Sequence, residues 1–516
     1  MSMAALPRGI DHWPGGLETI GHSLAVNAKR FPNKLALSSP RGALSYRELN
    51  DRANQLAHCL TDRGLAHGDH LAVLFGNTIE HVITLYAAAK VGVVSVVLDP
   101  KWVAREIFQA LELFDCKFLI YDCALGDDLF RCSVTSKIPA LVFDASAPGA
   151  SDFDRAFQTF PPANPTVEVS DNDVFMIMLT SGTTGRPKGC IKTHKSYAHS
   201  CTLGCVGLPI DENSRELLVV PIYYNSGRSS LITQLVIGAT VFLREHFDPR
   251  EALETIQRER ITCLALAPTQ CNELLAFPDL DRYDKRSLRF LRKAGLPFQA
   301  RTVQEITERI TPNVYQGYGG TEFSSAALLY PHEQMTKLGS AGHPLLGTEI
   351  EIVDDHRMPL PAGAHGEVRV RGASVCTGYY NNEEANRAAF IDGWYHSGDL
   401  GYLDEDGYLF IVGRKKDIVK TGGINVAPRE IEDVILSFPE VADVAVIGVP
   451  DEKWGESIKA LIVLKLGRRL SEEEVAKRCA VELSRYKVPK VIEFLDNLPR
   501  SPLGKVTLDF KTARRT

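Results

Sequence analysis

The stretch LTSGTTGRPKG, from Leu179 to Gly189, sets small hydroxyl residues and glycines beside a single lysine, Lys188. Glycines let a backbone turn its N–H groups inward, hydroxyl groups add donors, and the lysine adds a positive charge. This combination favours an anion, and phosphate above all. The stretch is not a Walker A loop, because proline precedes the lysine where that motif has glycine. On its own it is equally typical of a flexible surface turn.

Four further stretches with glycines beside polar or charged residues follow in order along the chain. They are QGYGGTE (316–322), GWYHSGDLG (393–401), GRKKDIVKTGG (413–423) and PRSPLGK (499–505). A single motif of this kind gives many false positives, and QGYGGTE alone is more typical of a tight glycine turn. Five stretches in a fixed order leave little room for coincidence.

Together the five stretches resemble the core motifs of the adenylate-forming superfamily, which includes acyl-CoA synthetases, adenylation domains of peptide synthetases and luciferases. The resemblance runs from about residue 15 to about residue 510. It implies a reaction in two steps: a carboxylate attacks the α-phosphate of ATP to give an acyl-adenylate and pyrophosphate, and a thiol then takes the acyl group. Because a carboxylate is already an anion, the first step needs cations and N–H donors rather than a general base.

The resemblance also implies roles for individual residues. Thr321 would hydrogen-bond the α-phosphate, Glu322 would bind Mg²⁺, and Lys505 would bridge the acid and the α-phosphate as the adenylate forms. These three are the predicted catalytic residues. The predicted contacts with ATP and CoA comprise Thr180, Ser181, Gly182, Thr183, Thr184, Gly185 and Lys188 at the phosphates, Gln316, Gly317, Tyr318 and Gly319 at the nucleotide, Asp399 and Arg414 at the ribose, and Gly422 and Gly423 beside the pantetheine arm. Among these, Tyr318 would stack on the adenine.

Each of these assignments has a plainer alternative. Asp399 could be a turn or helix-capping residue, and the glycine pair at 422–423 could form a simple turn. A lysine near a chain end is usually a solvated charge. For Lys505, the spacing to Pro499 and Gly504 preserves the motif and favours catalysis.

The expected acid pocket departs from the usual pattern. Many acyl- and aryl-CoA ligases carry histidine in a P-x-x-H-x-x-G motif, whereas this chain has Tyr224 in that position of PIYYNSG. We expect Tyr223, Tyr224 and Asn225 to shape the pocket, together with Gly295. Arg228 could be a counter-ion for a second acidic group, although an outward-pointing arginine is at least as common. The acid therefore stays open among aryl, aliphatic and dicarboxylic compounds.

The elements around these stretches predict a mixed α/β fold. Residues 1 to about 170 alternate short apolar runs with amphipathic stretches, which is the rhythm of a parallel α/β layer. The continuous apolar run from Val174 to Leu179 predicts a buried strand that leads into the phosphate stretch. Thr302 and Glu305 form a capping-box pattern at the start of a helix over residues 302–310.

A large N-terminal domain is expected over residues 1–413, multi-layered with parallel-type sheets, and carrying the AMP and acid sites. Residues 414–417 form a short charged hinge with Lys416 at the hinge position, and residues 418–516 form a small mobile α+β domain that carries Lys505. That domain is expected to contain an apolar-faced helix over residues 431–438, two long strands and a helix opened by Ser471. Rotation about the hinge can first exclude water from the adenylate and later admit the thiol.

Composition excludes several other classes. The chain has 516 residues, 44% of them hydrophobic and 24% charged, so two or more soluble folding units are expected. A net charge of −6 gives no electrostatic footprint for nucleic acid. We expect neither a membrane span nor a secretory signal. The eleven cysteines are scattered and predict reduced thiols, and the cluster His194, His199, Cys201 and Cys205 matches no familiar zinc spacing.

The leading prediction is an AMP-forming acid–CoA ligase that uses ATP, Mg²⁺ and CoA on a small-molecule carboxylic acid. A stand-alone adenylation enzyme that loads the phosphopantetheine of a carrier protein is the alternative. Luciferase-type oxidation is a remote option, and a non-catalytic relative is disfavoured because the motif residues are present. The last residues, TARRT, carry no peroxisomal address, so the cytoplasm is the expected location. The oligomeric state stays open, a homo-oligomer included.

Overall fold

The computed structural model describes residues 19–125, 138–144, 152–180, 187–293, 298, 300–421, 424–451 and 453–498. The chain divides into two compact units. The first comprises residues 1–336, 345–349 and 371–395, and the second comprises residues 337–344, 350–370 and 396–516. The turn at residues 414–417 falls inside the second unit, so the predicted domain bounds at 413 and 418 stay a prediction.

The first unit contains a six-stranded sheet that carries the phosphate stretch. Its strands alternate with helices along the chain and pair in parallel, except that the last two strands are antiparallel. Its order is β6 (Ala140–Phe143), β5 (Cys116–Asp122), β3 (His70–Leu74), β4 (Val94–Val97), β7 (Val174–Thr180) and β8 (Lys188–Thr193). The predicted strand at Val174–Leu179 is therefore confirmed as β7.

A second sheet of the first unit carries the QGYGGTE stretch. Five consecutive strand pairs in it are parallel, and hairpins add an antiparallel strand at each end. Its order within this unit is β2 (Gly42–Ser45), β1 (Leu35–Ser39), β10 (Thr240–Leu243), β9 (Arg215–Leu218), β11 (Cys263–Leu266), β12 (Phe290–Lys293), β13 (Val314–Gly320) and β14 (Ser324–Leu329). The α/β rhythm predicted for residues 1 to about 170 is confirmed by the first sheet, in which β3, β4 and β5 alternate with α3 (Ile79–Lys90) and α4 (Ala104–Leu113).

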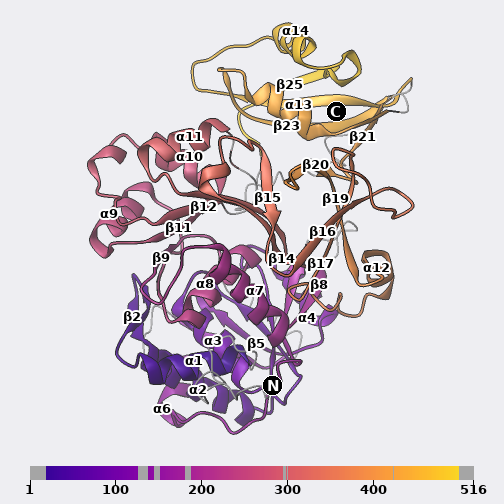
Figure 1. Cartoon of the computed structure of the whole chain (residues 1–516). Coiled ribbons are helices and arrows are strands. Elements are labelled where there is room, and N and C mark those ends of the chain that lie inside the picture. Colours follow the sequence, from indigo (N-terminus) through magenta and orange to yellow (C-terminus); the bar gives the residue numbers. More distant parts are fainter. Residues whose placement is uncertain are drawn as a thin grey trace, which may run out of the picture. The chain divides into compact units, whose positions relative to one another are not determined.

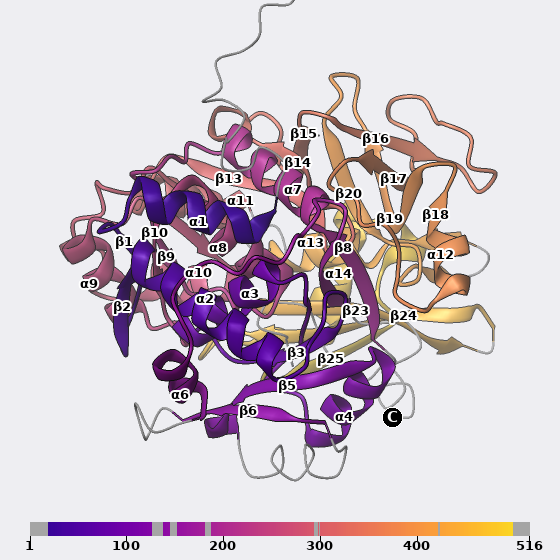
Figure 2. The same cartoon turned by 90° about the horizontal axis from the view of Figure 1, so that it is seen from below.

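Helices cover both faces of this second sheet (Figure 1). On one face, α8 (Asn225–Ile237) packs on β9 and β10, and α1 (Ile20–Arg30) joins it to α2 (Tyr46–Asp62) and α3 (Ile79–Lys90). Because α3 also packs on β3 and β4, these helices form a layer between the two sheets (Figure 2).

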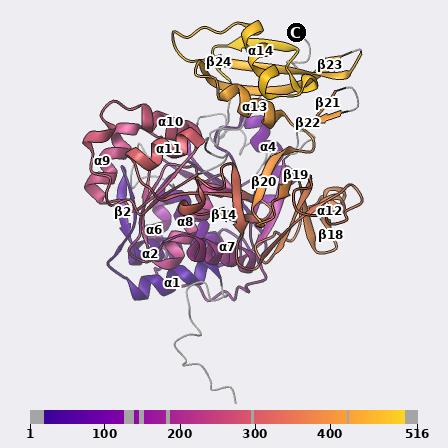
Figure 3. The ribbon, with the colours of Figure 1, turned by 45° about the horizontal axis from the view of Figure 1, so that its top comes forward.

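The opposite face is covered by α9 (Pro249–Glu259), α10 (Pro268–Ala276) and α11 (Ala300–Arg309), which lie side by side (Figures 1 and 3). Right-handed crossovers in opposite directions along the sheet require helices on both faces. The predicted helix at 302–310 is thus confirmed as α11. Its predicted cap is wrong, because the helix is already formed at Ala300 and Thr302 lies inside its first turn.

The described part of the first unit contains further α-helices and one short strand. They are α4 (Ala104–Leu113), α6 (Asp152–Thr159), α7 (His194–Gly207), α12 (Glu383–Ala389) and β18 (Phe390–Ile391). None of the described helices is both long enough and apolar enough to cross a membrane. The cysteines in the described ranges are free thiols.

The second unit contains two groups of strands. The first has the order β16 (Thr348–Val353), β17 (Gly366–Gly372), β19 (Trp394–Leu403), β20 (Leu409–Arg414) and β15 (Ser340–Pro344), some ends of which belong to the first unit. The second has the order β22 (Ile424–Val426), β21 (Val419–Thr421), β24 (Gly455–Leu464) and β23 (Val441–Asp451), with β25 (Val491–Leu495) also paired to β24.

Two helices close the core of this second group. The helix α13 (Pro428–Leu436) buries Ile431 and Ile435 against β23, as its apolar spacing predicts. The helix α14 (Glu472–Glu482) begins after Ser471, whose side chain accepts from the backbone of Glu474 while that glutamate accepts in return. The predicted capping box at this helix is therefore confirmed.

Candidate nucleotide and acid site

The QGYGGTE stretch forms the end of β13 and the turn into β14, a turn that comprises Thr321–Ser324 and is here called the signature turn. The two strands approach so closely that side chains cannot fit at two positions. A Cβ atom on Gly317 would lie 2.4 Å from the carbonyl oxygen of Ala327, and one on Gly319 would lie 2.5 Å from that of Ser324. These glycines are therefore required by backbone approach before any contact with a nucleotide is considered.

Two other residues of this stretch have buried side chains. The ring of Tyr318 packs against the ring of Phe323, with the centroids 5.0 Å apart. The amide of Gln316 accepts a hydrogen bond from the backbone N–H of Phe298 at 2.7 Å and donates to the side chain of Gln334 at 3.0 Å. That amide is used to join β13 to neighbouring segments, and the nucleotide contacts of both residues stay predictions.

The carboxylate of Glu322 is held by a tyrosine that the motif comparison had missed. The hydroxyl of Tyr379 donates to Glu322 Oε1 at 3.0 Å and lies 3.4 Å from the hydroxyl of Tyr395. Burial, with the nearby negative charge of Glu322, raises the pKa of Tyr379 and of Tyr395, so both phenols keep their protons. The sequence signals that could have indicated these residues are the GYY sequence around Tyr379 and the GWYHSG sequence around Tyr395.

Lys188 reaches the same tyrosine from the phosphate stretch. Its Nζ lies 5.0 Å from the centroid of the Tyr379 ring, within the range of a cation–π contact. The structure therefore brings a cation and a carboxylate, which are far apart in the sequence, to one tyrosine. Thr180 pairs with Lys188 across β7 and β8, so both lie at the end of this hairpin.

In the second unit, Asp399 and Arg414, the two residues predicted to contact the ribose, form an ion pair. They are opposite one another on β19 and β20, and Arg414 Nε lies 2.8 Å from Asp399 Oδ1. Asp399 is buried, and its N–H donates to the hydroxyl of Ser397. The alternative of a helix-capping aspartate is wrong, because the residue lies within a strand. Lys416 lies on the exposed turn that follows β20.

Tyr224, which replaces the usual histidine, is the N-cap residue of α8. Its hydroxyl donates to Asp99 Oδ2 at 2.7 Å, and burial together with this carboxylate raises its pKa. Its ring lies 4.7 Å from that of Tyr223. Asp99 was missed by the sequence analysis, although a carboxylate just after the buried strand β4 is a recognisable signal for a site residue.

Two side chains of the acid region donate to backbone oxygens, one of which belongs to the residue just before the signature turn. Asn225 Nδ2 donates to the carbonyl oxygen of Gly320 at 3.2 Å. Arg228 is 1% exposed and donates from Nη1 to the carbonyl oxygens of Ile222 and Tyr223. The alternative of an outward-pointing arginine is therefore wrong, because its guanidinium supports the loop that carries Tyr223.

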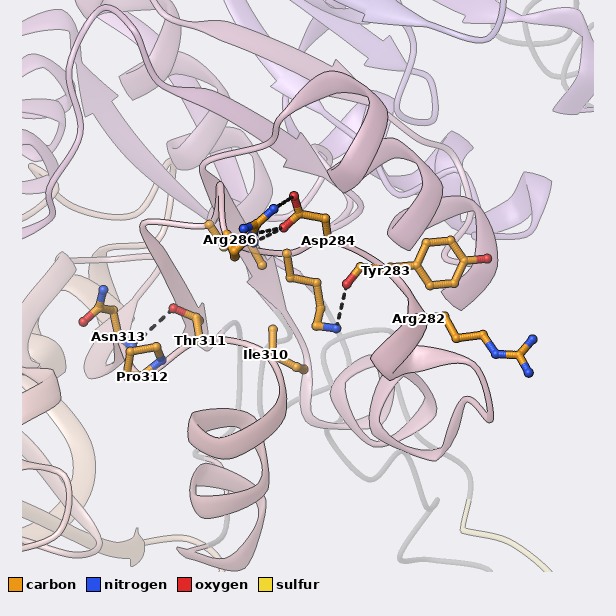
Figure 4. Close-up of a pocket in the computed structure, with 10 residues that line it drawn as sticks. Arg282, Tyr283, Asp284, Arg286, Ile310, Thr311, Pro312 and Asn313 are labelled. Carbon is orange, nitrogen blue, oxygen red and sulfur yellow. Dashed lines mark hydrogen bonds and ion pairs between the residues drawn. The ribbon is translucent and has the colours of Figure 1, made fainter.

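Several predicted residues lie outside the described ranges. They are Ser181, Gly182, Thr183, Thr184, Gly185, Gly295, Gly422, Gly423 and Lys505. A surface pocket elsewhere is lined by residues 282–286, 288 and 310–313 and contains none of the predicted site residues (Figure 4). Its charged groups have partners within the protein, such as the ion pair of Arg286 with Asp284.

The geometry defines a class: a parallel α/β protein in which Lys188, at the end of the β7–β8 hairpin, and Glu322, on the signature turn, meet at one tyrosine. Comparison with known proteins agrees. The family model of AMP-binding enzymes matches residues 24–380, and that of their C-terminal domain matches residues 430–505. The chain belongs to the AMP-binding enzyme family.

Individual relatives narrow this class. The chain is 35% identical to a 2-succinylbenzoate–CoA ligase of Bacillus licheniformis, over 94% of this chain and 97% of the relative. It is 32% identical to a long-chain-fatty-acid–CoA ligase of Mycobacterium tuberculosis, over 95% and 97%. An o-succinylbenzoate–CoA synthetase of Bacillus subtilis, solved with its acyl-adenylate intermediate, matches with a TM-score of 0.84 and 32% identity over 94% of this chain and 96% of that one. These relatives confirm the predicted family, fold and reaction class, an ATP-dependent acid–CoA ligase, and favour it over the loading of a carrier protein.

Proposed function

We propose that this protein joins a small-molecule carboxylic acid to CoA through an acyl-adenylate, with ATP and Mg²⁺. The observation that carries the proposal is the convergence of Lys188 and Glu322 on Tyr379. Attack of a carboxylate on a phosphate brings two anions together, so it needs a cation and a metal ligand at one place. In this proposal Lys188 binds the phosphates of ATP, and Thr321 donates to the α-phosphate.

Glu322 fits a magnesium ligand. Magnesium is commonly held by one or two protein carboxylates together with substrate phosphates, rather than by a cage of protein ligands. The hydrogen bond from Tyr379 orients the carboxylate, and a bound Mg²⁺ would neutralise charge on the phosphates.

The remaining roles follow the resemblance. Asp399 would accept from the ribose hydroxyls, with Arg414 fixing its carboxylate through the 2.8 Å ion pair. Lys505 would bridge the acid and the α-phosphate, and Gly422 and Gly423 would leave room for the pantetheine arm of CoA. We also propose the domain bounds 1–413 and 418–516 with a hinge at 414–417, and a cytoplasmic location, which the free thiols support.

The proposal covers carboxylic acids as a class and does not name one acid as the substrate. The relatives are named for 2-succinylbenzoate, indoleacetate and ferulate, which are aryl compounds, and also for long-chain fatty acids, so their names cover both aryl and aliphatic substrates. We place Tyr223, Tyr224 and Asn225 in the pocket because they adjoin the signature turn through Gly320.

Pyrophosphate release tests the proposal. The purified protein is given ATP, Mg²⁺ and a panel of aryl, aliphatic and dicarboxylic acids, each with and without CoA. We expect release that depends on one class of acid, and continuous turnover to AMP and an acyl-CoA, identified by mass, only when CoA is present. Release that stays near one equivalent with CoA would indicate a carrier-protein acceptor. No acid-dependent release across the panel would contradict the proposal.

A further inference from the structure

A buried lysine that none of the assigned roles uses lies beneath the signature turn. Lys192 is on β8, four residues after Lys188, and its side chain is fully buried. The strand pairs on one side with β7, where Met176 is opposite Lys192. On its other side it bonds to residues 377–380, for example from Ile191 N–H to the carbonyl oxygen of Gly378 at 2.9 Å.

The ammonium group of Lys192 bonds to three oxygen atoms from two separate segments. Nζ donates to the carbonyl oxygen of Ser374 at 2.5 Å, to the carbonyl oxygen of Glu322 at 3.1 Å and to the hydroxyl of Ser324 at 3.4 Å. All three acceptors are uncharged groups. Two of them belong to the signature turn, so the lysine connects the strand of the phosphate stretch to the backbone of the predicted magnesium ligand.

Burial of this charge is costly. Removal from water lowers the pKa of Lys192, an effect that the nearby side chains of Cys376, Cys190 and Glu322 only partly offset. An apolar side chain at the same position of the strand would avoid this cost. The cost therefore points to what the ammonium holds in place.

The signature turn needs such support, because its backbone is strained. Ser324 has a φ of 58°, in the left-handed region that a side chain disfavours. Its hydroxyl also accepts from Ser200, and the carbonyl oxygen of Glu322 also accepts from the N–H of Cys376 at 2.6 Å. The hydroxyl of Ser374 donates to the carbonyl oxygen of Phe323. One oxygen atom of each of three consecutive residues, Glu322 to Ser324, therefore accepts a hydrogen bond. The ammonium of Lys192 donates to two of these oxygens, and Ser374 donates to the third.

We propose that Lys192 is a positioning residue for adenylate formation: its buried ammonium fixes the signature turn so that Glu322 and Thr321 present their side chains to the nucleotide and its magnesium ion. The proposal rests on the proposed function, because it assigns Lys192 to the first half-reaction. It differs from the role of Lys188, which would touch ATP itself, since Lys192 acts through the carbonyl oxygen of Glu322.

The test compares Lys192→Met with a matched control, Lys90→Met. Lys90 is also a buried lysine of the first unit, and its Nζ donates to the side chains of Asn50 and Asn164, at 2.9 and 3.1 Å, rather than to the signature turn. Pyrophosphate release with the acid that the wild type prefers is measured across a magnesium titration, together with the melting temperature. Lys192→Gln, whose amide can still donate, is the conservative variant.

We expect Lys192→Met to lower kcat of adenylate formation about 10- to 100-fold, because small displacements of catalytic groups have effects of this size. We also expect it to raise the half-saturating concentration of Mg²⁺, with the KM for the acid unchanged. Lys192→Gln should recover part of the loss. Lys90→Met should change the melting temperature alone.

A kcat and a magnesium profile within twofold of the wild type in Lys192→Met would overturn the proposal. So would equal losses in Lys90→Met, because the effect would then be a general result of removing a buried charge. If Lys192→Met does not fold, Lys192→Gln decides in the same assay, and an unchanged magnesium profile there overturns the positioning role. A wild type without acid-dependent pyrophosphate release would instead refute the proposed function.

Discussion

The nucleotide region and the acid region of the first unit are neighbours, yet they are held by different kinds of contact. The signature turn and the strand that leads into it are fixed through their backbones, the strand by its close approach to β14 at Gly317 and the turn by the ammonium of Lys192. The acid region is fixed by donors on its own side chains, chiefly the hydroxyl of Tyr224 to Asp99 and the guanidinium of Arg228 to carbonyl oxygens of its own loop. A backbone fixed by glycines tolerates little change, whereas a pocket lined by side chains can be altered one residue at a time. This difference suits an enzyme family that keeps ATP and changes its acid.

The largest expected effect tests the nucleotide region. In Glu322→Gln the side chain can still accept from Tyr379, so the fold should remain, but the negative charge that suits Mg²⁺ is gone. We expect kcat of adenylate formation to fall by at least about 100-fold, the scale of losing one preorganised electrostatic contact. The loss should be the same for every acid, as measured by pyrophosphate release with several substrates.

Two observations would refute that assignment. One is a loss in Glu322→Gln that varies strongly between acids, which would place this carboxylate in the acid pocket. The other is a variant as active as the wild type over the whole magnesium titration. Circular dichroism and the melting temperature provide the control for folding.

A smaller effect tests the acid region. Tyr224→Phe removes the hydroxyl that donates to Asp99 and leaves that carboxylate without this partner. We expect kcat/KM for the acid to fall about 3- to 10-fold, consistent with the loss of one partly buried hydrogen bond. The order of preference among acids should also change, while the KM for ATP stays within about twofold, as initial rates with each substrate varied in turn would measure.

The matched variant for this prediction is Asp99→Asn, which keeps an acceptor for the tyrosine and removes the charge. Asp99→Asn should change the preference between acids with and without a second charged group more than Tyr224→Phe does. If both variants instead raise the KM for ATP and affect all acids equally, the two regions are not separable in the way the contacts indicate.

The same contrast explains what could be predicted from the sequence. The strands and the α/β rhythm follow from local patterns, because glycines and apolar runs near one another report on one turn or strand. The roles given to Glu322 and its neighbours come from the family resemblance and stay predictions. Tyr379 and Asp99 were missed because each meets its partner only through the fold, and no spacing in the sequence records that meeting. Lys192 lies between the phosphate stretch and the histidine–cysteine cluster that begins at His194. Its burial could not be predicted, because it depends on segments that are distant in the sequence and pack on β8 only in the fold.

Two local errors have equally physical causes. Thr302 and Glu305 have the spacing of a capping box, yet the chain is helical from Ala300, so the pattern falls inside the helix. Arg228 was given an outward alternative because arginines are usually exposed. Here it is buried because the loop before α8 offers it two carbonyl oxygens.

The smallest expected effect concerns the stability of the protein at acidic pH, through a histidine next to the strand that carries Lys188 and Lys192. His194 directly follows β8 and is fully buried, and its Nδ1 accepts from the backbone N–H of Ile20 at 3.2 Å. Burial lowers its pKa from 6.5 to about 4. Between these two values the unfolded chain binds more protons than the folded protein, so the free energy of unfolding falls as the pH falls from 6.5 towards 4. The loss from this group alone should be about 2 kcal/mol at pH 5.

His194→Asn keeps an acceptor near the N–H of Ile20 and removes the titrating ring. Denaturant unfolding at pH 7.5 and at pH 5 should therefore show a smaller difference in the free energy of unfolding for this variant than for the wild type. His332→Asn, at a side chain that is 80% exposed, is the control and should leave that difference unchanged. An unaltered difference in His194→Asn would mean that other groups set the acid sensitivity. In that case the titration of His194 would not be the cause of the lower free energy of unfolding at pH 5.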